Sequence, residues 1–306
     1  MTRDHLKLHL LTLICAIYAP FPLLSATAEE IKLEYAGRTL NANFVLADGK
    51  GLSDGAILIT HGTLAHNRME LIATLQTVIA ERGLNTLAIN LSLGLDDRYG
   101  MYDCSVPHRH LGRNAAKEIA RWVDWLKGKG VADITVMGHS RGGNQTARYA
   151  AQEPDPAVKR VVLLAPTTWD AGKVTAKFKK RHNAPLADVL ARAEAMAAAG
   201  RGQELMAGVG VLYCPGTDVT AQTFLDYYRP DPAHDAPSIV GEIKVPVLVI
   251  AASQDRVVTD LPEKMTGRVG GNVGFIVIED AGHFFLNFFA EDVADTIAKF
   301  VGGRFF

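Results

Sequence analysis

Residues 134–143 have the sequence ITVMGHSRGG, in which an apolar run leads directly into Gly-His-Ser-Arg-Gly at positions 138–142. This motif fits G-x-S-x-G, and a helical pattern resumes past Gly142. Glycines two residues before and two after the serine leave room for a sharp strand-to-helix turn, which exposes a strained serine hydroxyl at the carboxyl edge of a sheet. The segment therefore predicts a buried strand at 134–137, a helix at 145–151, and Ser140 as a nucleophile between them.

On both sides of this segment, short aliphatic runs alternate with stretches of helical periodicity. That alternation is typical of β-α-β units and predicts an α/β fold, with a mostly parallel central sheet flanked by helices. Residues 30–36 and 38–46, separated by Gly37, predict an opening hairpin. The remaining strands are predicted at residues 56–60, 86–91, 160–164, 245–251 and 274–278, and the remaining helices at residues 67–82, 114–127 and 291–301.

Residues 168–242 break this alternation. They contain an Ala-rich helix at 187–199, a basic run at 177–182 and a strand signal at 209–213. We predict that they form a cap or lid inserted into a single domain that spans residues 29–306, and that the basic run is a solvated face of this cap.

Two residues downstream of Ser140 complete a set suited to nucleophilic catalysis. A serine hydroxyl becomes nucleophilic when an imidazole accepts its proton, and a carboxylate fixes the tautomer of that imidazole. Asp255 and His283 each follow a predicted strand, at the sheet edge where ligands gather in open α/β sheets. We therefore predict that His283 is the general base and Asp255 its acid partner, with Asp260 and Asp170 as alternative acids.

The same chemistry needs hydrogen-bond donors for the oxyanion of a tetrahedral intermediate. The backbone N–H of Arg141 begins the region after the nucleophile, and the N–H of Thr63 lies just beyond the strand at 56–60. We predict these two amides as the oxyanion hole.

Taken together, these motifs resemble the α/β-hydrolase superfamily over about residues 30–300. The resemblance rests on His61-Gly62-Thr63, the Gly138–Gly142 turn, the strand leading to Asp255, and Gly282-His283. It implies the α/β-hydrolase fold of single-domain esterases, lipases and thioesterases, acting without a cofactor. One segment departs from the family pattern, because residues 90–95 (NLSLGL) lack the D-x-x-G-x-G that many relatives carry after the fourth strand.

From these residues we expect a serine hydrolase that acts on a carboxylic ester or thioester of small to medium size, through an acyl-enzyme intermediate. Two alternatives stay open. The first is an acyltransferase that uses the same three residues, and the second is a non-catalytic binding or accessory protein, since a fold by itself does not establish activity. The sequence does not determine the oligomeric state.

Residues 1–28 predict a secretory signal peptide. A basic start precedes an apolar stretch at 10–24, and Ala26-Thr27-Ala28 matches the small-x-small pattern of a cleavage site. The apolar stretch is too short for a spanning helix, so we expect no stable membrane anchor after cleavage, and a periplasmic or secreted protein. Cys104 and Cys214 would remain, either as a disulfide or as two buried thiols.

Composition argues against other functional classes. Lys plus Arg is 32 and Asp plus Glu is 33, and no long run of one sign suggests a nucleic-acid partner. The glycine-rich stretches match no phosphate or dinucleotide motif, so we expect no cofactor. His108 and His110 have the spacing of a ligand pair, but no third ligand is evident, so we expect no metal. Of Phe284, Phe285, Phe288 and Phe289, we expect at least one to line an acyl pocket and the others to pack in the core.

Overall fold

The computed structural model describes residues 28–152 and 154–304 of the chain. Its main feature is an eight-stranded sheet with the order β1-β2-β4-β3-β5-β6-β9-β10. These strands are β1 (Ala28–Tyr35), β2 (Arg38–Val45), β3 (Ala56–Thr60), β4 (Thr86–Asn90), β5 (Ile134–His139), β6 (Val158–Leu164), β9 (Val247–Ala252) and β10 (Val273–Ile278).

The sheet is parallel except at one edge. β1 and β2 form an antiparallel hairpin, and β2 pairs antiparallel with β4. From β4 through to β10 every neighbouring pair is parallel, and β3, β4, β5 and β9 are buried along their whole length. Continuous aliphatic runs suit strands covered on both faces. The α/β class predicted from the sequence is confirmed.

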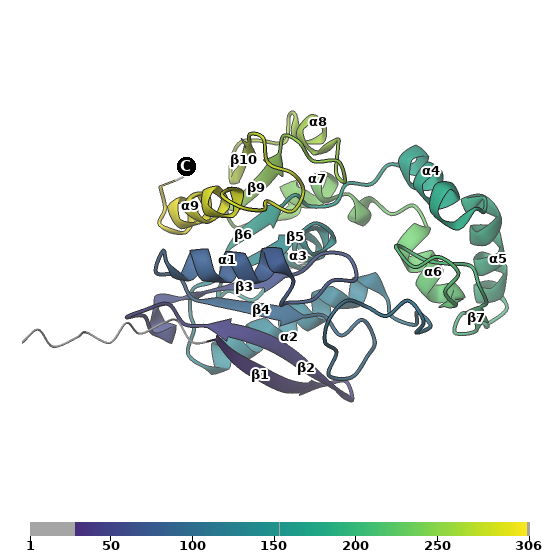
Figure 1. The fold of residues 1–306 in the computed structure, drawn as a ribbon, viewed down its shortest axis with the longest axis horizontal. Coiled ribbons are helices and arrows are strands. Elements are labelled where there is room, and N and C mark those ends of the chain that lie inside the picture. The colour runs from purple at the N-terminus through teal and green to yellow at the C-terminus, as the bar shows by residue number, and fades with distance from the viewer. Residues whose placement is uncertain (1–27, 153, 305–306) are drawn as a thin grey trace, which may run out of the picture.

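Helices cover both faces of the sheet (Figure 1). α1 (Glu70–Ala80) and α9 (Phe289–Val301) pack on one face, and α2 (Ala115–Gly128) and α3 (Arg141–Ala151) pack on the other. The sheet therefore has a hydrophobic core on each face, and successive residues of a strand pack into opposite cores. Ile57 and Ile59 pack with α1 and α9, whereas Leu58 packs with α2. This alternation follows from the two-residue period of side chains in a strand.

A long insertion separates β6 from β9, which are neighbours in the sheet. It contains α4 (Ala171–His182), α5 (Leu186–Ala198), α6 (Ala221–Tyr228) and α7 (Ala236–Ile239), with the two-stranded pair β7 (Leu205–Met206) and β8 (Val219–Thr220). α4, α5 and α6 project beyond one end of the sheet (Figure 1). The position agrees with the predicted insertion at 168–242, and its action as a cap stays a prediction.

Two kinds of link hold the insertion to the rest of the chain. A disulfide joins Cys104 to Cys214, which decides between the two alternatives for this pair. Lys264 in α8 (Leu261–Met265) forms an ion pair with Asp235 at 2.7 Å, beside the start of α7. The disulfide thereby anchors the interior of the insertion, and the ion pair anchors it near its C-terminal end.

Three predicted elements differ from the structure by more than two residues or in type. α3 begins at Arg141 and not after Gly142, because the turn at Ser140 is tight enough for the helix to start at the next residue. α1 is shorter than the predicted 67–82 at both ends, since the Asn67 side chain donates to the Ala88 carbonyl in the sheet and Gly83 takes a φ of 73°. The strand signal at 209–213 is a tight turn, in which Val211 and Cys214 exchange backbone hydrogen bonds.

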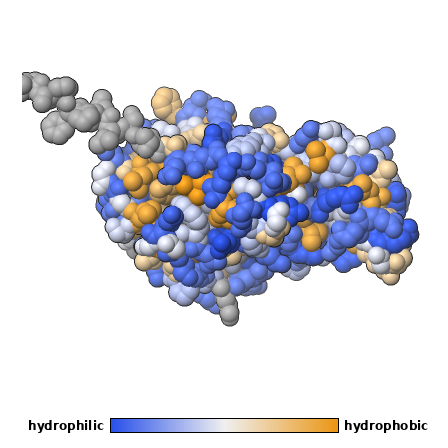
Figure 2. Space-filling view, turned by 90° about the horizontal axis from the view of Figure 1, so that it is seen from below, coloured by the Kyte–Doolittle hydropathy of each residue, from blue (hydrophilic) through white to orange (hydrophobic). Residues whose placement is uncertain are grey.

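The predicted signal peptide lies outside the described residues, apart from Ala28 at the start of β1. Among residues that the structure describes, no helix combines the length and apolar character needed to cross a bilayer. The face seen in Figure 2 is largely hydrophilic, with separate hydrophobic patches between the polar residues.

Candidate active site

The turn between β5 and α3 holds Ser140 in a strained conformation, with φ 55° and ψ −122°. Its backbone N–H donates to the Leu164 carbonyl at 2.9 Å, which ties the turn to the end of β6. A Cβ on Gly138 would lie 2.3 Å from the Gly142 carbonyl oxygen, and a Cβ on Gly142 would lie 2.2 Å from the His61 carbonyl oxygen. Both glycines are therefore required by close backbone contact, as the motif predicts.

Three elements bring the predicted side chains together at the carboxyl edge of the sheet. Ser140 follows β5, Asp255 follows β9 and His283 follows β10. His283 Nε2 lies 3.0 Å from Ser140 Oγ, and His283 Nδ1 lies 2.7 Å from Asp255 Oδ2. Such an arrangement can move a proton from the serine hydroxyl to the imidazole while the carboxylate holds the ring.

The Asp255 carboxylate is buried and fully engaged. Its Oδ1 accepts hydrogen bonds from the backbone N–H of Val257 at 2.7 Å and of Val258 at 2.8 Å, which leaves Oδ2 for His283. Burial by itself would raise the pKa of Asp255, but the hydrogen bonds from His283 and from these amides outweigh it and lower the pKa below its usual value. The carboxylate is thus ionised at neutral pH and able to orient His283.

The two alternative acids have other partners. Asp260 accepts a hydrogen bond from Thr168 at 2.5 Å and pairs with Lys173 at 2.8 Å. Asp170 caps the N-terminus of α4 through the Lys173 backbone N–H at 2.7 Å. Neither carboxylate contacts His283, so the geometry favours Asp255.

The two backbone amides predicted as oxyanion donors belong to segments next to the serine, since Arg141 follows Ser140 directly and a Cβ on Gly62, before Thr63, would lie 3.3 Å from the Ser140 Cβ. In the described part of the chain, neither the Thr63 N–H nor the Arg141 N–H donates to a backbone or side-chain acceptor. The Arg141 N–H is free because it begins α3, where the first amides of a helix lack intrahelical acceptors. Side chains of the same two residues meet, since Arg141 Nε donates to Thr63 Oγ1 at 3.2 Å.

A buried network behind Thr63 was not foreseen from the sequence. His61 Nδ1 donates to the Gly62 carbonyl at 2.9 Å, and its Nε2 accepts from the Leu91 amide and from Arg98, each at 3.1 Å. Arg98 also donates to Asn90 Oδ1 at 2.6 Å. Asn90 begins the segment that departs from the resemblance, and its amide accepts from the Arg98 side chain through Oδ1 while its Nδ2 donates to the Arg98 carbonyl, which an ionised aspartate could not do.

His139 and the loop after β10 form the opposite wall of the site. His139 Nε2 donates to the His283 carbonyl at 2.9 Å, and the Phe284 ring packs edge-on against His283 with centroids 5.1 Å apart. Phe285 is buried in the core between α1 and α9, as expected. Phe288, by contrast, is 86% exposed, so the expectation that the other phenylalanines pack in the core is wrong for this residue, which precedes α9 at the surface.

His108 and His110 lie together, with ring centroids 5.2 Å apart. Burial lowers the pKa of His108 to about 4 and that of His110 to about 3, so both rings are neutral. Within residues 28–152 and 154–304, their ring nitrogens have no hydrogen-bond partner, and no group of three His, Cys, Asp or Glu side chains is placed to hold a metal.

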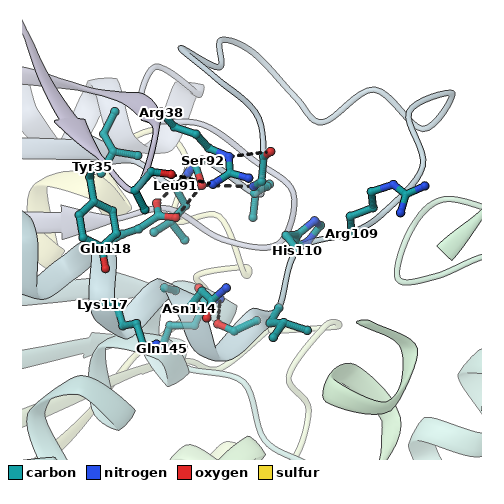
Figure 3. Close-up of a pocket in the computed structure, with 17 residues that line it drawn as sticks. Tyr35, Arg38, Leu91, Ser92, Arg109, His110, Asn114, Lys117, Glu118 and Gln145 are labelled. Atoms are coloured by element: carbon teal, nitrogen blue, oxygen red, sulfur yellow. Dashed lines mark hydrogen bonds between the residues drawn. The ribbon is translucent and has the colours of Figure 1, made fainter. Parts of the chain in front are cut away.

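A separate cavity of about 230 Å³ lies beside His110, between the β1–β2 hairpin and the start of α2 (Figure 3). Arg38, Tyr35 and Gln145 contribute to its wall, and the buried Glu118 carboxylate accepts hydrogen bonds from the Ser92 N–H and Oγ at 2.8 and 2.6 Å. None of Ser140, His283 and Thr63 lines this cavity. It is therefore distinct from the place where Ser140 could react.

Comparisons with known proteins agree with this geometry. A sequence model described as "Alpha/beta hydrolase family" matches residues 57–296. No curated protein matches the chain. Similar solved structures include Est1E from Butyrivibrio proteoclasticus, at 19% identity and TM-score 0.61, over 92% of this chain and 99% of that one.

Two further solved structures share the fold. The esterase Pf2001 from Pyrococcus furiosus is 16% identical with TM-score 0.59, over 92% of each chain. The dienelactone hydrolase from Anabaena variabilis is 18% identical with TM-score 0.56, over 92% of this chain and 99% of that one. At these identities the likeness concerns the fold alone.

Proposed function

Because the chain belongs to the alpha/beta hydrolase family, we propose that it is a serine hydrolase that cleaves a carboxylic ester or thioester of a small molecule. The observation that carries the proposal is the continuous contact from Ser140 Oγ through His283 to Asp255, at 3.0 and 2.7 Å. The strained serine and the two free amides beside it support the same reaction.

The proposed mechanism has two halves. Ser140 Oγ attacks the acyl carbon while its proton passes to His283 Nε2, and the amides of Thr63 and Arg141 stabilise the oxyanion. The protonated His283 gives its proton to the departing alcohol or thiol, which leaves an acyl-serine ester. Water then attacks that ester as His283 accepts the water proton, and collapse of the second intermediate returns the proton to Ser140 and releases the acid.

Export and a specificity role for the insertion belong to the same proposal. The pattern of residues 1–28 and the Cys104–Cys214 disulfide both favour an oxidising compartment outside the cytoplasm. Contacts of the insertion with α3 support a cap over the site, since Asn144 donates to the Ala233 carbonyl at 2.8 Å and the Arg141 guanidinium lies over Tyr227.

One experiment tests the reaction without knowledge of the substrate. The full chain is expressed in a bacterial host, recovered from the periplasm, treated with a fluorophosphonate probe and weighed intact. We expect a mature chain that begins at Glu29 and carries one adduct. Ser140→Ala should carry none, His283→Ala should react at least about 100-fold more slowly, and Ser53→Ala, which removes an exposed serine far from the site, should react like the wild type.

Two outcomes would contradict the proposal. If folded wild-type protein forms no adduct, the chain is not an active serine hydrolase, and the non-catalytic alternative replaces the proposal. If the recovered chain retains residues 1–28, the proposed cleavage is wrong whatever the adduct shows.

A further inference from the structure

The side chain of Arg141 occupies a position that the proposed mechanism does not use. Its backbone amide is a proposed oxyanion donor, and its guanidinium extends toward Thr63 and toward α6 of the insertion. Nε donates to Thr63 Oγ1 at 3.2 Å, and the guanidinium carbon lies 5.3 Å from the centre of the Tyr227 ring. The charge is therefore held in place beside the reacting serine by both the body of the protein and the insertion.

This half-buried cation has no counter-ion. Of the carboxylates in the described residues, none lies within 4.0 Å of the Arg141 guanidinium. Asp226, next to Tyr227 in sequence, pairs with Arg113 at 3.1 Å. Apart from Nε, the guanidinium donates no hydrogen bond to the described residues. The N–H groups of its two terminal nitrogens thus remain available to bind a ligand.

The titratable side chains around Arg141 do not supply a negative charge. Burial lowers the pKa of His110 to about 3 and also lowers the pKa of His234, so both are neutral. Burial raises the pKa of Tyr227 far above neutral pH, despite the opposing effect of Arg141. A partly desolvated guanidinium in neutral surroundings favours an anion from outside the chain.

We infer that Arg141 forms a carboxylate-binding subsite, and that the preferred substrates carry a carboxylate on the acyl part of the ester or thioester. The leaving group departs on the side of His283, which must protonate it, whereas the Arg141 side chain lies on the side of Thr63 and Tyr227. A planar guanidinium binds a carboxylate through two parallel N–H···O bonds, which gives orientation as well as affinity. This inference rests on the proposed function, because it assumes acyl transfer to Ser140.

The test compares two matched substrates. Mono-4-nitrophenyl adipate ends its acyl chain in a carboxylate, and its analogue ends the same chain in a carboxamide. We measure kcat/KM for both, and take the ratio of the carboxylate to the carboxamide substrate. Both substrates use the same oxyanion hole, so any damage to the turn lowers both rates together and cancels in the ratio.

We expect a ratio of at least about 10 in the wild type, carried mainly by KM, since a charge-assisted contact of this kind changes binding by an order of magnitude or more. Arg141→Gln should lower the ratio at least about tenfold. Arg141→Lys should lower it by an intermediate amount, because a lysine keeps the positive charge but lacks the planar pair of N–H donors. Arg121→Gln on the exposed face of α2 makes the same charge change and should leave the ratio within about twofold.

Each failure points to a different claim. A wild-type ratio of one or below, or an unchanged ratio in Arg141→Gln, overturns the subsite while fluorophosphonate labelling of Ser140 leaves the hydrolase proposal intact. Absence of labelling overturns both. An equal fall of the ratio in Arg121→Gln would mean that net charge, and not Arg141, attracts the anionic substrate.

Discussion

At the scale of single residues, the site depends on which carboxylate reaches His283. Asp255 has both oxygens engaged, one by the amides of Val257 and Val258 and the other by the imidazole. Asp260 is also buried and also has a lowered pKa: burial alone would raise it, and the hydrogen bonds from Lys173 and Thr168 more than offset that effect. A perturbed pKa therefore marks both residues, and only the contact with His283 distinguishes them.

The first prediction follows from this difference. Asp255→Asn keeps the size of the side chain but removes the charge that holds the Nδ1–H tautomer of His283, so kcat on 4-nitrophenyl butyrate should fall about 10³- to 10⁴-fold with folding retained. Asp260→Asn should keep kcat within about threefold while lowering the melting temperature, since it weakens a structural ion pair. If Asp260→Asn loses the activity and Asp255→Asn keeps it, the assignment of the acid is wrong.

At the scale of elements, the junction of β5 and α3 determines the position of Ser140, the proposed nucleophile. α3 begins directly after Ser140, and its first turn passes so close to the end of β3 that Gly142 would place a Cβ 2.2 Å from the His61 carbonyl oxygen and 2.6 Å from that of Thr60. Strand, turn and helix can approach in this way only without side chains at 138 and 142. The packing of two elements thus explains a local sequence motif.

The second prediction concerns that packing. Gly142→Ala should lower the free energy of unfolding by at least about 2 kcal/mol, because the methyl group must displace backbone and not a flexible side chain. Gly128→Ala, at the end of α2 with nothing within 4 Å of the added Cβ, should be neutral or stabilise by up to about 1 kcal/mol. Urea denaturation of both variants measures the difference. Equal stability of the two would refute the close contact at position 142.

At the scale of the whole molecule, several histidines are enclosed by the fold in their neutral form. Burial is the main cause at each, and it lowers the pKa of His61, His110 and His139 to about 3 and that of His108 to about 4. In the unfolded chain these groups titrate near 6.5. Between those values the unfolded state binds protons that the folded state cannot bind, so acid favours unfolding.

The third prediction is a loss of stability as pH falls below about 6.5, well above the range in which carboxylates titrate. Each such histidine contributes up to about 1.4 kcal/mol per pH unit until the pH reaches its folded pKa. Urea unfolding at pH 7.5, 6 and 5 measures the slope. His108→Phe, at a site whose ring nitrogens have no described hydrogen-bond partner, should make the slope shallower. A slope unchanged by this substitution would show that His108 is not enclosed in its neutral form.

The α/β class, most strands and helices, and the proximity of Ser140, His283 and Asp255 could all be predicted from the amino-acid sequence. These follow from local rules: fully buried parallel strands require continuous aliphatic runs, and the carboxyl ends of parallel strands meet at one edge of the sheet. That is why side chains 143 positions apart could be expected together before their distance was known. The Gly-x-Ser-x-Gly turn is likewise encoded within a few residues.

Contacts between polar side chains that no shared periodicity relates could be seen only in the folded chain. Arg98 reaches His61 across 37 positions, and Cys104 reaches Cys214 across 110. Arg141 was predicted for its amide alone, and its uncompensated guanidinium became evident only with Tyr227 of the insertion beside it. Such contacts escape sequence rules because a buried charge or hydrogen bond depends on everything packed around it, and that environment is assembled from distant segments of the chain.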